Sequence, residues 1–332
     1  MILYPIRENG KMGFINQIGD IVIAPRFQNP QLHLVHHHKS VDFTDWVPVM
    51  LNNHWGYIDA TGEFQIEPTF ELADWFSEDL APVGQIVSRS YNVPQGLWGC
   101  IDRKCELVIP YQWANIDGFT NGQAIVERLH QGDDGVVYPE SDSLVIDRQG
   151  NILPSPVPGR CGRNSYIHEN GTISLWYDDD PDTINLEPVS NGARYGFKNA
   201  TGDLAIPCVY DEVDYFRREE GLCTVRVGKL WGVIDHTGEM VIEPQFLSPL
   251  FFSEGLAMAK VKVPVVESGK RKLVTRYGFV DTRGEWAIEP QFTAVPDDPP
   301  SFQDGLALVN VGKARAYVNH AGLIVWKEKP TE

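Results

Sequence analysis

The chain has 332 residues, of which 42% are hydrophobic and 11% aromatic, so its composition favours a folded core over disorder. Its formal net charge of −17 disfavours nucleic-acid binding, because phosphate backbones repel an acidic chain. No segment approaches the roughly 18 apolar residues of a membrane helix, and the start, MILYPIRENG, lacks the pattern of a secretory signal. We therefore expect a cytoplasmic protein that does not contact membranes.

A short motif recurs along the chain at a mean spacing of about 43 residues, a period typical of propeller blades and other stacked repeats. It is clearest as WGYIDATG from Trp55, and it returns as WGCIDRKC from Trp98 and WGVIDHTG from Trp231. Variants begin at Met12 (MGFINQIG), Ser143 (SLVIDRQG), Tyr195 (YGFKNATG), Tyr277 (YGFVDTRG) and Arg315 (RAYVNHAG). The sequence therefore predicts about eight repeats of one structural unit.

Within each unit the pattern predicts three strands. The first resembles Leu80–Val83 (LAPV) and ends in a tight turn such as Asn9-Gly10, whose residues tolerate positive φ. The second strand is the WGxID segment, where glycine leaves room for a neighbouring backbone or ring. A D-x-x-G turn leads to a third strand that ends at a proline such as Pro68. The connection that follows, through Phe76, could hide a short fourth strand.

These motifs resemble those of the WG (KWG) β-repeat family of bacterial proteins over nearly the full length. The resemblance implies architecture and says little about function. We expect an all-β fold: a β-propeller-like array of about seven to eight three- to four-stranded antiparallel units in one domain, residues 1–332. The hydrophobic last strand, Leu323–Trp326, favours closure into a propeller, and an open β-meander stack is the alternative.

Three units depart from the repeat at the hairpin between the first two strands. It is stretched after Val83, Val126 and Ala259. Because these loops join equivalent strands, they project from equivalent positions and predict a partner-binding face, with Tyr91, Asp133 and Asp134 among its residues. Drift in tolerant surface loops is the alternative explanation.

The largest irregularity is a divergent insertion at residues 155–183. It contains an aromatic pair followed by clustered carboxylates, and this combination suits an interface with a basic protein. We therefore assign partner binding to Trp176, Tyr177, Asp178, Asp179, Asp180 and Asp182. A solvated acidic loop and the remnant of a degenerate repeat are the alternatives.

No catalytic, metal or cofactor site is predicted. The carboxylates Asp59, Asp102, Asp235 and Asp281 recur once per unit, as expected of a structural residue rather than a catalytic one. The histidines His33, His36, His37 and His38 form one surface loop and cannot all face one ion. Five cysteines without a paired spacing fit reduced thiols.

The sequence is therefore interpreted as a non-enzymatic protein-binding scaffold, with an inhibitor or immunity-type role against a basic protein as its more specific form. Two alternatives stay open: a divergent hydrolase with an acidic central pocket, and a purely structural assembly module. The identity of the partner and the oligomeric state are left open.

Overall fold

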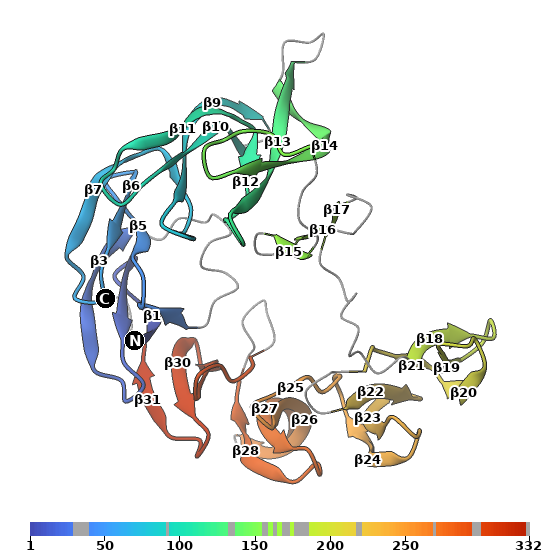
Figure 1. Cartoon of the computed structure of the whole chain (residues 1–332). Helices are drawn as coiled ribbons and strands as arrows, with labels where there is room; N and C mark the ends of the chain where they lie inside the picture. Colours follow the sequence, from blue (N-terminus) through green and yellow to red (C-terminus); the bar gives the residue numbers. More distant parts are fainter. Residues whose placement is uncertain are drawn as a thin grey trace. The chain divides into compact units, whose positions relative to one another are not determined.

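In the computed structural model, the described residues form β-strands and turns and contain no helix (Figure 1). The structure describes residues 1–28, 40–90, 93–131, 137–154, 159–161, 165–167, 173–175, 186–216, 221–267, 270–293 and 300–329. The strands form a series of small antiparallel sheets that follow the repeats in order. The predicted all-β repeat array is confirmed.

Most sheets contain the three predicted strands in chain order, and several begin with a short extra strand. Sheets with all four strands are β8 (Leu72–Ala73), β9 (Ala81–Ser90), β10 (Val93–Ile101), β11 (Leu107–Trp113); β21 (Glu212–Val213), β22 (Leu222–Val227), β23 (Leu230–Asp235), β24 (Met240–Phe246); and β25 (Phe252–Ser253), β26 (Leu256–Glu267), β27 (Lys270–Asp281), β28 (Trp286–Phe292). Sheets of three strands are β12 (Asn115–Ile116), β13 (Gln123–Gln131), β14 (Val137–Asp147); β18 (Leu186–Ser190), β19 (Tyr195–Asn199), β20 (Leu204–Tyr210); and β29 (Leu306–Val311), β30 (Ala314–Asn319), β31 (Ile324–Lys327). The short fourth strand exists, and it pairs with the first strand of the following unit.

The first two repeats share one seven-stranded sheet. Its order is β4 (Val41–Asp42), β1 (Ile2–Glu8), β2 (Lys11–Ile15), β3 (Ile21–Gln28), β5 (Val47–Leu51), β6 (His54–Ile58), β7 (Phe64–Phe70). The short strand β4 pairs with β1 and not with the strand that follows it, so it covers an edge of β1 that would otherwise present unpaired N–H and C=O groups.

The predicted insertion contains a small sheet of its own, with β15 (Gly159–Cys161), β16 (Ser165–Ile167) and β17 (Ile173–Leu175). These strands pair antiparallel in chain order, as the strands of the repeats do. The structure does not decide between a degenerate repeat and the other interpretations of this segment, which stay predictions.

The second strand of a unit is buried on both faces. In β6, Trp55 is 1% exposed and both Tyr57 and Ile58 are 0% exposed, although the last two point to opposite faces. In this repeat the second strand is therefore covered on both faces, and the apolar clusters combine residues of consecutive repeats.

The glycine of the WG motif lies against the third strand of its own unit. A Cβ on Gly56 would lie 2.6 Å from the carbonyl oxygen of Ile66, and one on Gly232 would lie 2.5 Å from that of Ile242. The strand register shifts at the same place. The predicted close backbone approach is confirmed, and it explains why glycine follows the aromatic residue.

By internal contacts the chain divides into two compact units, residues 1–15 with 21–179, and residues 16–20 with 180–332. The first unit holds the sheets from β1 to β17, and the second holds those from β18 to β31. Closure of the array into a single propeller stays a prediction.

Candidate interaction surface

The partner-binding residues predicted from sequence lie outside the described residues. They are Tyr91, Asp133, Asp134, Trp176, Tyr177, Asp178, Asp179, Asp180 and Asp182. The histidines His33, His36, His37 and His38 also lie outside them. The structure therefore brings none of these residues together, and a candidate surface has to be built from the parts of the repeats that it describes.

Each sheet has two ends with different contents. We call the end with the hairpin between the first and second strands the hairpin end. The opposite end, which we call the turn end, carries the D-x-x-G turn and the turn that leads from the short strand into the first strand. The two ends can be compared across all repeats because every unit has the same strand order.

At the turn end, one carboxylate or amide oxygen caps each D-x-x-G turn. Oδ1 of Asp235 accepts hydrogen bonds from the N–H groups of Thr237 at 2.8 Å and Glu239 at 3.1 Å. Asn319 makes the same pair of bonds to Ala321 and Leu323 at 3.1 and 3.0 Å. The turn residues Asn16, Asp59, Asp102, Asp147, Asn199 and Asp281 do likewise. The role of this position is therefore structural, as predicted for the recurring acids.

Hydrogen bonding to the turn lowers the pKa of several of these carboxyl groups. The Thr61 side chain lowers the pKa of Asp59, and the Thr237 side chain lowers that of Asp235. In Asp147 and Asp281, slight burial opposes the shift, but side-chain and backbone hydrogen bonds still hold the pKa below its ordinary value. The turns therefore favour the charged carboxylate.

The turn end also carries the apolar contacts between consecutive repeats. The residue after the WG glycine packs edge-on against a phenylalanine of the next connection, as in Tyr57–Phe76 and Phe279–Phe302, with ring centroids 4.9 Å apart in both pairs. The turn glycine meets the third-strand isoleucine of the preceding repeat. A Cβ on Gly238, for example, would lie 3.2 Å from Cγ2 of Ile206.

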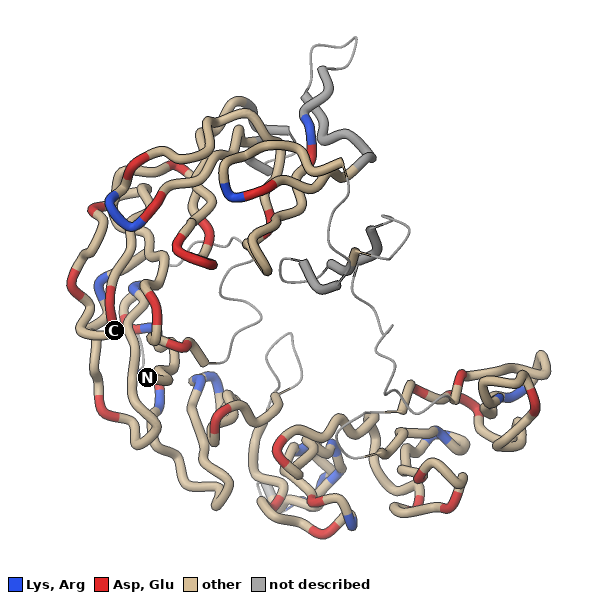
Figure 2. The backbone as a smooth tube through the Cα atoms, in the orientation of Figure 1, with Lys and Arg blue, Asp and Glu red and all other residues tan. Residues whose placement is uncertain are grey.

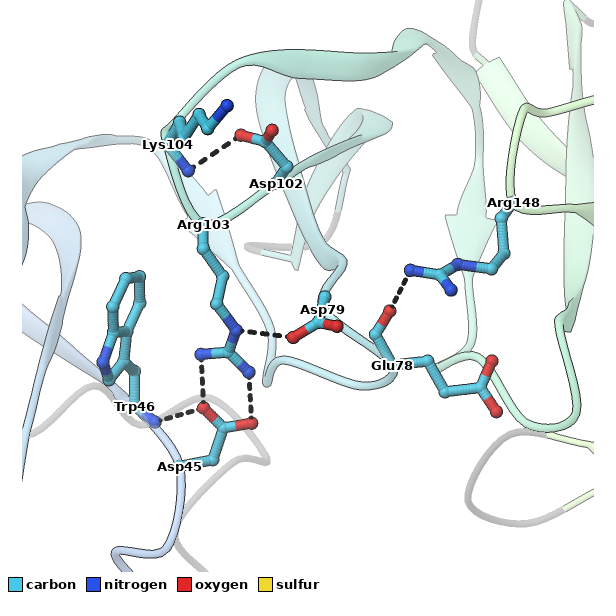
Figure 3. A network of polar contacts seen from close by, with 8 residues as sticks. All are labelled: Asp45, Trp46, Glu78, Asp79, Asp102, Arg103, Lys104 and Arg148. Atoms are coloured by element: carbon cyan, nitrogen blue, oxygen red, sulfur yellow. Dashed lines mark hydrogen bonds and ion pairs between the residues drawn. The ribbon is translucent and has the colours of Figure 1, made fainter.

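A polar network joins three repeats of the first unit at this end (Figure 3). The guanidinium of Arg103 donates two hydrogen bonds of 2.7 Å to the carboxylate of Asp45, and its Nε donates one of 2.8 Å to Asp79. It also lies over the rings of Trp46 and Phe76, at 5.0 and 4.6 Å from their centroids. Arg103 therefore combines a bidentate ion pair with stacking, two interactions that lysine reproduces poorly.

The network shifts the pKa values of its charged groups. Partial burial opposes ionisation of Asp45, but hydrogen bonds from Arg103 and from the Trp46 N–H hold its pKa below the ordinary value. The hydrogen bond to Asp45 is the main cause of the raised pKa of Arg103. Both groups are therefore charged over the physiological pH range.

The same position links repeats elsewhere with other residue types. Arg103 directly follows the turn residue Asp102. Its equivalent Arg148 donates to the carbonyl oxygen of Glu78 at 2.5 Å, and His320 contacts Glu254 at 3.1 Å. Gln17, which belongs with the second unit, donates to the carbonyl oxygen of Asp304 at 2.9 Å. In these four repeats the residue after the turn Asp or Asn therefore contacts a neighbouring repeat, a link that the sequence interpretation missed.

The hairpin end differs from repeat to repeat. Four hairpins close with two-residue turns after the pairs Glu8–Lys11, Leu51–His54, Val227–Leu230 and Val311–Ala314. Three others continue as paired strands to Ser90–Val93, Gln131–Val137 and Glu267–Lys270. These are the three stretched hairpins expected from sequence, and they are extensions of the strands rather than loose loops.

The β26–β27 hairpin is strongly basic although the chain is acidic (Figure 2). Between Lys260 and Tyr277 it carries six Lys and Arg residues and one Glu, whereas the whole chain has 28 Lys and Arg and 45 Asp and Glu. Val266 and Leu273 near its tip are 70% and 65% exposed. Cations beside exposed aliphatic side chains suit contact with a partner.

One other acidic position stands out in the first unit. Burial, followed by the nearby charge of Asp117, raises the pKa of Glu127 on β13. Asp117 occupies a repeated position, since Asp74 and Asp214 precede the equivalent first strands. Nearby, Gln112, Trp113, Arg128, Gly150, Asn151 and Ile152 line an open depression. Only Glu127 of this carboxylate pair is specific to its repeat.

Within the described ranges, no group of His, Cys, Asp and Glu side chains has the arrangement of a metal site. Cys100, Cys105 and Cys208 are free thiols, and burial raises the pKa of Cys100 to about 12. No helix with the length and apolarity of a membrane span occurs in the part of the chain that the structure describes.

The chain is similar to the solved structure of PorZ, a bacterial surface component of the type-IX secretion system of Porphyromonas gingivalis. The two are 10% identical, and the match has a TM-score of 0.22 and covers 99% of this chain and 52% of that one. The chain thus spans about half the length of that structure. No curated protein sequence matches the chain.

The family model for the WG containing repeat matches six segments: residues 12–29, 55–85, 98–128, 195–231, 231–262 and 277–313. They cover more than half of the chain and coincide with the strands, turns and inter-repeat contacts described above. The chain belongs to the WG containing repeat family.

Proposed function

We propose that this chain is a non-enzymatic protein-binding scaffold whose long hairpins are its contact elements. One observation carries the proposal. Repeats with the same turn end differ at the hairpin end, where three hairpins extend well beyond the others. Side chains of the turn end join the repeats, and the short hairpins also make hydrogen bonds to the preceding repeat, as Asn53 does with Gln28 and Gly228 with Asp211. The extended parts of the three long hairpins lie beyond such contacts, so they are the parts free to vary with a partner.

Part of the chain's excess of carboxylates is explained by the structural role of Asp side chains at the turn end. Carboxylates such as Asp45, Asp59 and Asp235 accept hydrogen bonds within turns or between repeats. These carboxylates already bind groups of the chain itself, so a basic partner would contact other carboxylates. We assign that role to Asp133, Asp134, Asp178, Asp179, Asp180 and Asp182, which lie outside the described residues.

The more specific form of the proposal is an inhibitor or immunity-type protein in the cytoplasm. It would bind a basic protein by electrostatic steering and block it. The net charge of −17 supports this form.

Affinity capture of the tagged protein from its native cytoplasm, with elution in rising salt, tests the proposal. We expect a basic protein that elutes with salt and is lost when Asp178, Asp179, Asp180 and Asp182 become Asn. A partner that survives those substitutions but is lost on shortening a hairpin supports the scaffold and excludes the acidic segment. A partner that resists salt favours a structural assembly module, and no partner at any salt contradicts the scaffold.

A divergent hydrolase is the second candidate, and the raised pKa of Glu127 is the observation that favours it. Such an enzyme would lose hydrolysis of glycoside or ester substrates in Glu127→Gln. It would keep activity in Asp214→Asn, a change at the repeated position equivalent to Asp117. The absence of hydrolysis in the unmodified protein over a broad substrate panel would exclude this candidate.

A further inference from the structure

The β26–β27 hairpin projects beyond the rest of its sheet as a two-stranded ribbon. The short strand β25 pairs with β26 only at Leu256 and Ala257, and β28 pairs with β27 only from Tyr277 to Val280. Between residues 261 and 276, no described strand pairs with the outer side of either strand. The projecting part is about seven residue pairs long, or roughly 24 Å.

The outer edge of β26 is blocked at two points, and among the described residues that of β27 is open. The carbonyl oxygen of Lys260 accepts a hydrogen bond from the Leu247 N–H at 2.9 Å, so the backbone polar groups of Lys260 face outward. Alternation along the strand places the backbone nitrogen of Pro264 outward as well, where it cannot donate. On β27 the same alternation turns the N–H groups of Arg271, Leu273 and Thr275 outward. Arg276 donates to the Thr275 carbonyl oxygen at 3.0 Å, so the open groups are concentrated toward the tip.

The side chains along this edge have a simple pattern. Lys270, Lys272 and Arg276 lie on one face of the ribbon, together with Val274. Arg271, Leu273 and Thr275 lie on the other. If an added strand carried carboxylates at alternate positions, those carboxylates would lie beside Lys270, Lys272 and Arg276. The apolar residues between the carboxylates would lie beside Leu273.

We propose that the outer edge of β27, residues Lys270–Arg276, binds an extended acidic segment of a protein partner as an added antiparallel or parallel strand. We call these residues the basic edge. The segment that fits best alternates acidic and apolar residues. The proposal rests on the scaffold function and deepens it, because it gives the class of partner that one of the three hairpins recognises.

The geometry favours a polypeptide over other anionic partners. Strand addition uses backbone groups that a nucleic acid or a lipid headgroup does not offer in this spacing. A duplex or a membrane also presents an extended negative surface, which the net charge of −17 repels more strongly than it repels one short acidic segment. Lys and Arg on exposed edges also discourage aggregation, and the experiment separates this protective role from binding.

The test uses the full chain and a dye-labelled, capped eight-residue peptide of alternating Glu and Val, with binding measured by fluorescence anisotropy at about 0.15 M salt. We expect saturable binding that falls at least about tenfold in K270E/R271E/K272E. A matched control, K11E/K229E/K313E, makes the same change in net charge at exposed lysines beside short hairpin turns. That control should bind the peptide like the unmodified chain. A peptide with the same residues in two blocks, four Glu and then four Val, should bind more weakly.

A second variant, Leu273→Pro, removes an outward N–H and keeps the bonds between β26 and β27. It should also weaken binding, because it blocks strand addition without changing charge. Equal loss in the two triple variants, or full binding by the Pro variant, would overturn strand addition at the basic edge. Tighter binding to duplex DNA or to phosphatidylserine vesicles than to the peptide would overturn the choice of partner. If the peptide fails to bind while hairpin shortening still abolishes capture of a native partner, the scaffold function stands and this inference falls.

Discussion

A single side-chain oxygen organises each D-x-x-G turn, and its charge varies among the repeats. Asp serves in five turns and Asn in three, with the same pair of backbone bonds. Asn is therefore a natural substitute for Asp at this position. The two residues differ in their response to acid, because only Asp titrates.

Acid should weaken the Asp-capped turns selectively. The pKa of Asp235 is lowered from 3.8 in the folded chain, so its contribution to stability is present above that value and is lost as pH falls through the folded pKa. We expect Asp235→Asn to unfold at lower urea than the unmodified chain at pH 7, with the difference shrinking toward pH 3. Asn319→Asp should instead unfold at higher urea than the unmodified chain at pH 7, and this gain should shrink toward pH 3. Equal differences at both pH values would contradict this account.

The glycine of the WG motif should be the least replaceable residue of the second strand. Gly232→Ala places a Cβ 2.5 Å from the Ile242 carbonyl oxygen, so the third strand must move. We expect a loss of about 1–3 kcal/mol in the free energy of unfolding, measured by urea denaturation. Gly228→Asn is the control, because Gly228 has φ of 65° and no atom within 4 Å of an added Cβ. A neutral Gly232→Ala variant would show that the close approach is not required.

At the scale of the element, consecutive repeats are joined at their hairpin ends, where Asp211 accepts a hydrogen bond from the Gly228 N–H, and at their turn ends. Tyr57 and Phe76, Gly238 and Ile206, and Arg103 and Asp45 all connect consecutive repeats there. The bidentate pair of Arg103 is the most developed of these polar contacts, and its contribution can be isolated.

A double-mutant cycle on Arg103→Ala and Asp45→Asn should give a coupling energy of about 1 kcal/mol in urea unfolding. Arg283→Ala is the matched control, because Arg283 pairs with Asp281 and Glu285 of its own turn and is 72% exposed. That variant should be close to neutral. Additive effects of the Arg103 and Asp45 changes would mean that the network does not stabilise the array.

The strands and turns were predictable because their signals are local. WGxID, the D-x-x-G turn and the Pro that follows lie within about fifteen residues of one another, and each has its own backbone requirement. The inter-repeat contacts were not predictable in this way. At the position after the turn Asp or Asn, Arg103, His320 and Gln17 share a place in the fold but no chemical pattern. Their partners lie in other repeats, far away in sequence.

The candidate surface was predicted in part. The stretched hairpins could be located because they interrupt a fixed spacing, but the spacing does not show that they continue as strands. The blocked and open edges of the β26–β27 hairpin depend on which backbone groups face outward, and only the strand register fixes that.

At the scale of the whole molecule, the turn end recurs from repeat to repeat and the hairpin end varies, which predicts that the long hairpins can be changed without loss of the fold. Replacing residues 262–275 by Asn-Gly would leave the Val261–Arg276 pair to close the hairpin with a two-residue turn, as in other repeats. We expect the free energy of unfolding to change by less than about 1 kcal/mol, since the removed part is largely exposed. A loss of several kcal/mol in urea denaturation would give the hairpin a structural role.

The central claim is that partners contact the hairpin ends and not the turn ends. Site-specific photo-crosslinking in the cells that make the protein tests it most directly, with one crosslinking residue per variant at matched exposed aliphatic positions. Val87 and Val266 on two long hairpins are 47% and 70% exposed, and Ile18 and Leu204 near the turn ends are 73% and 58% exposed. The account predicts crosslinks to another protein from Val87 or Val266 and none from Ile18 or Leu204. Crosslinks from the turn-end positions alone would contradict it.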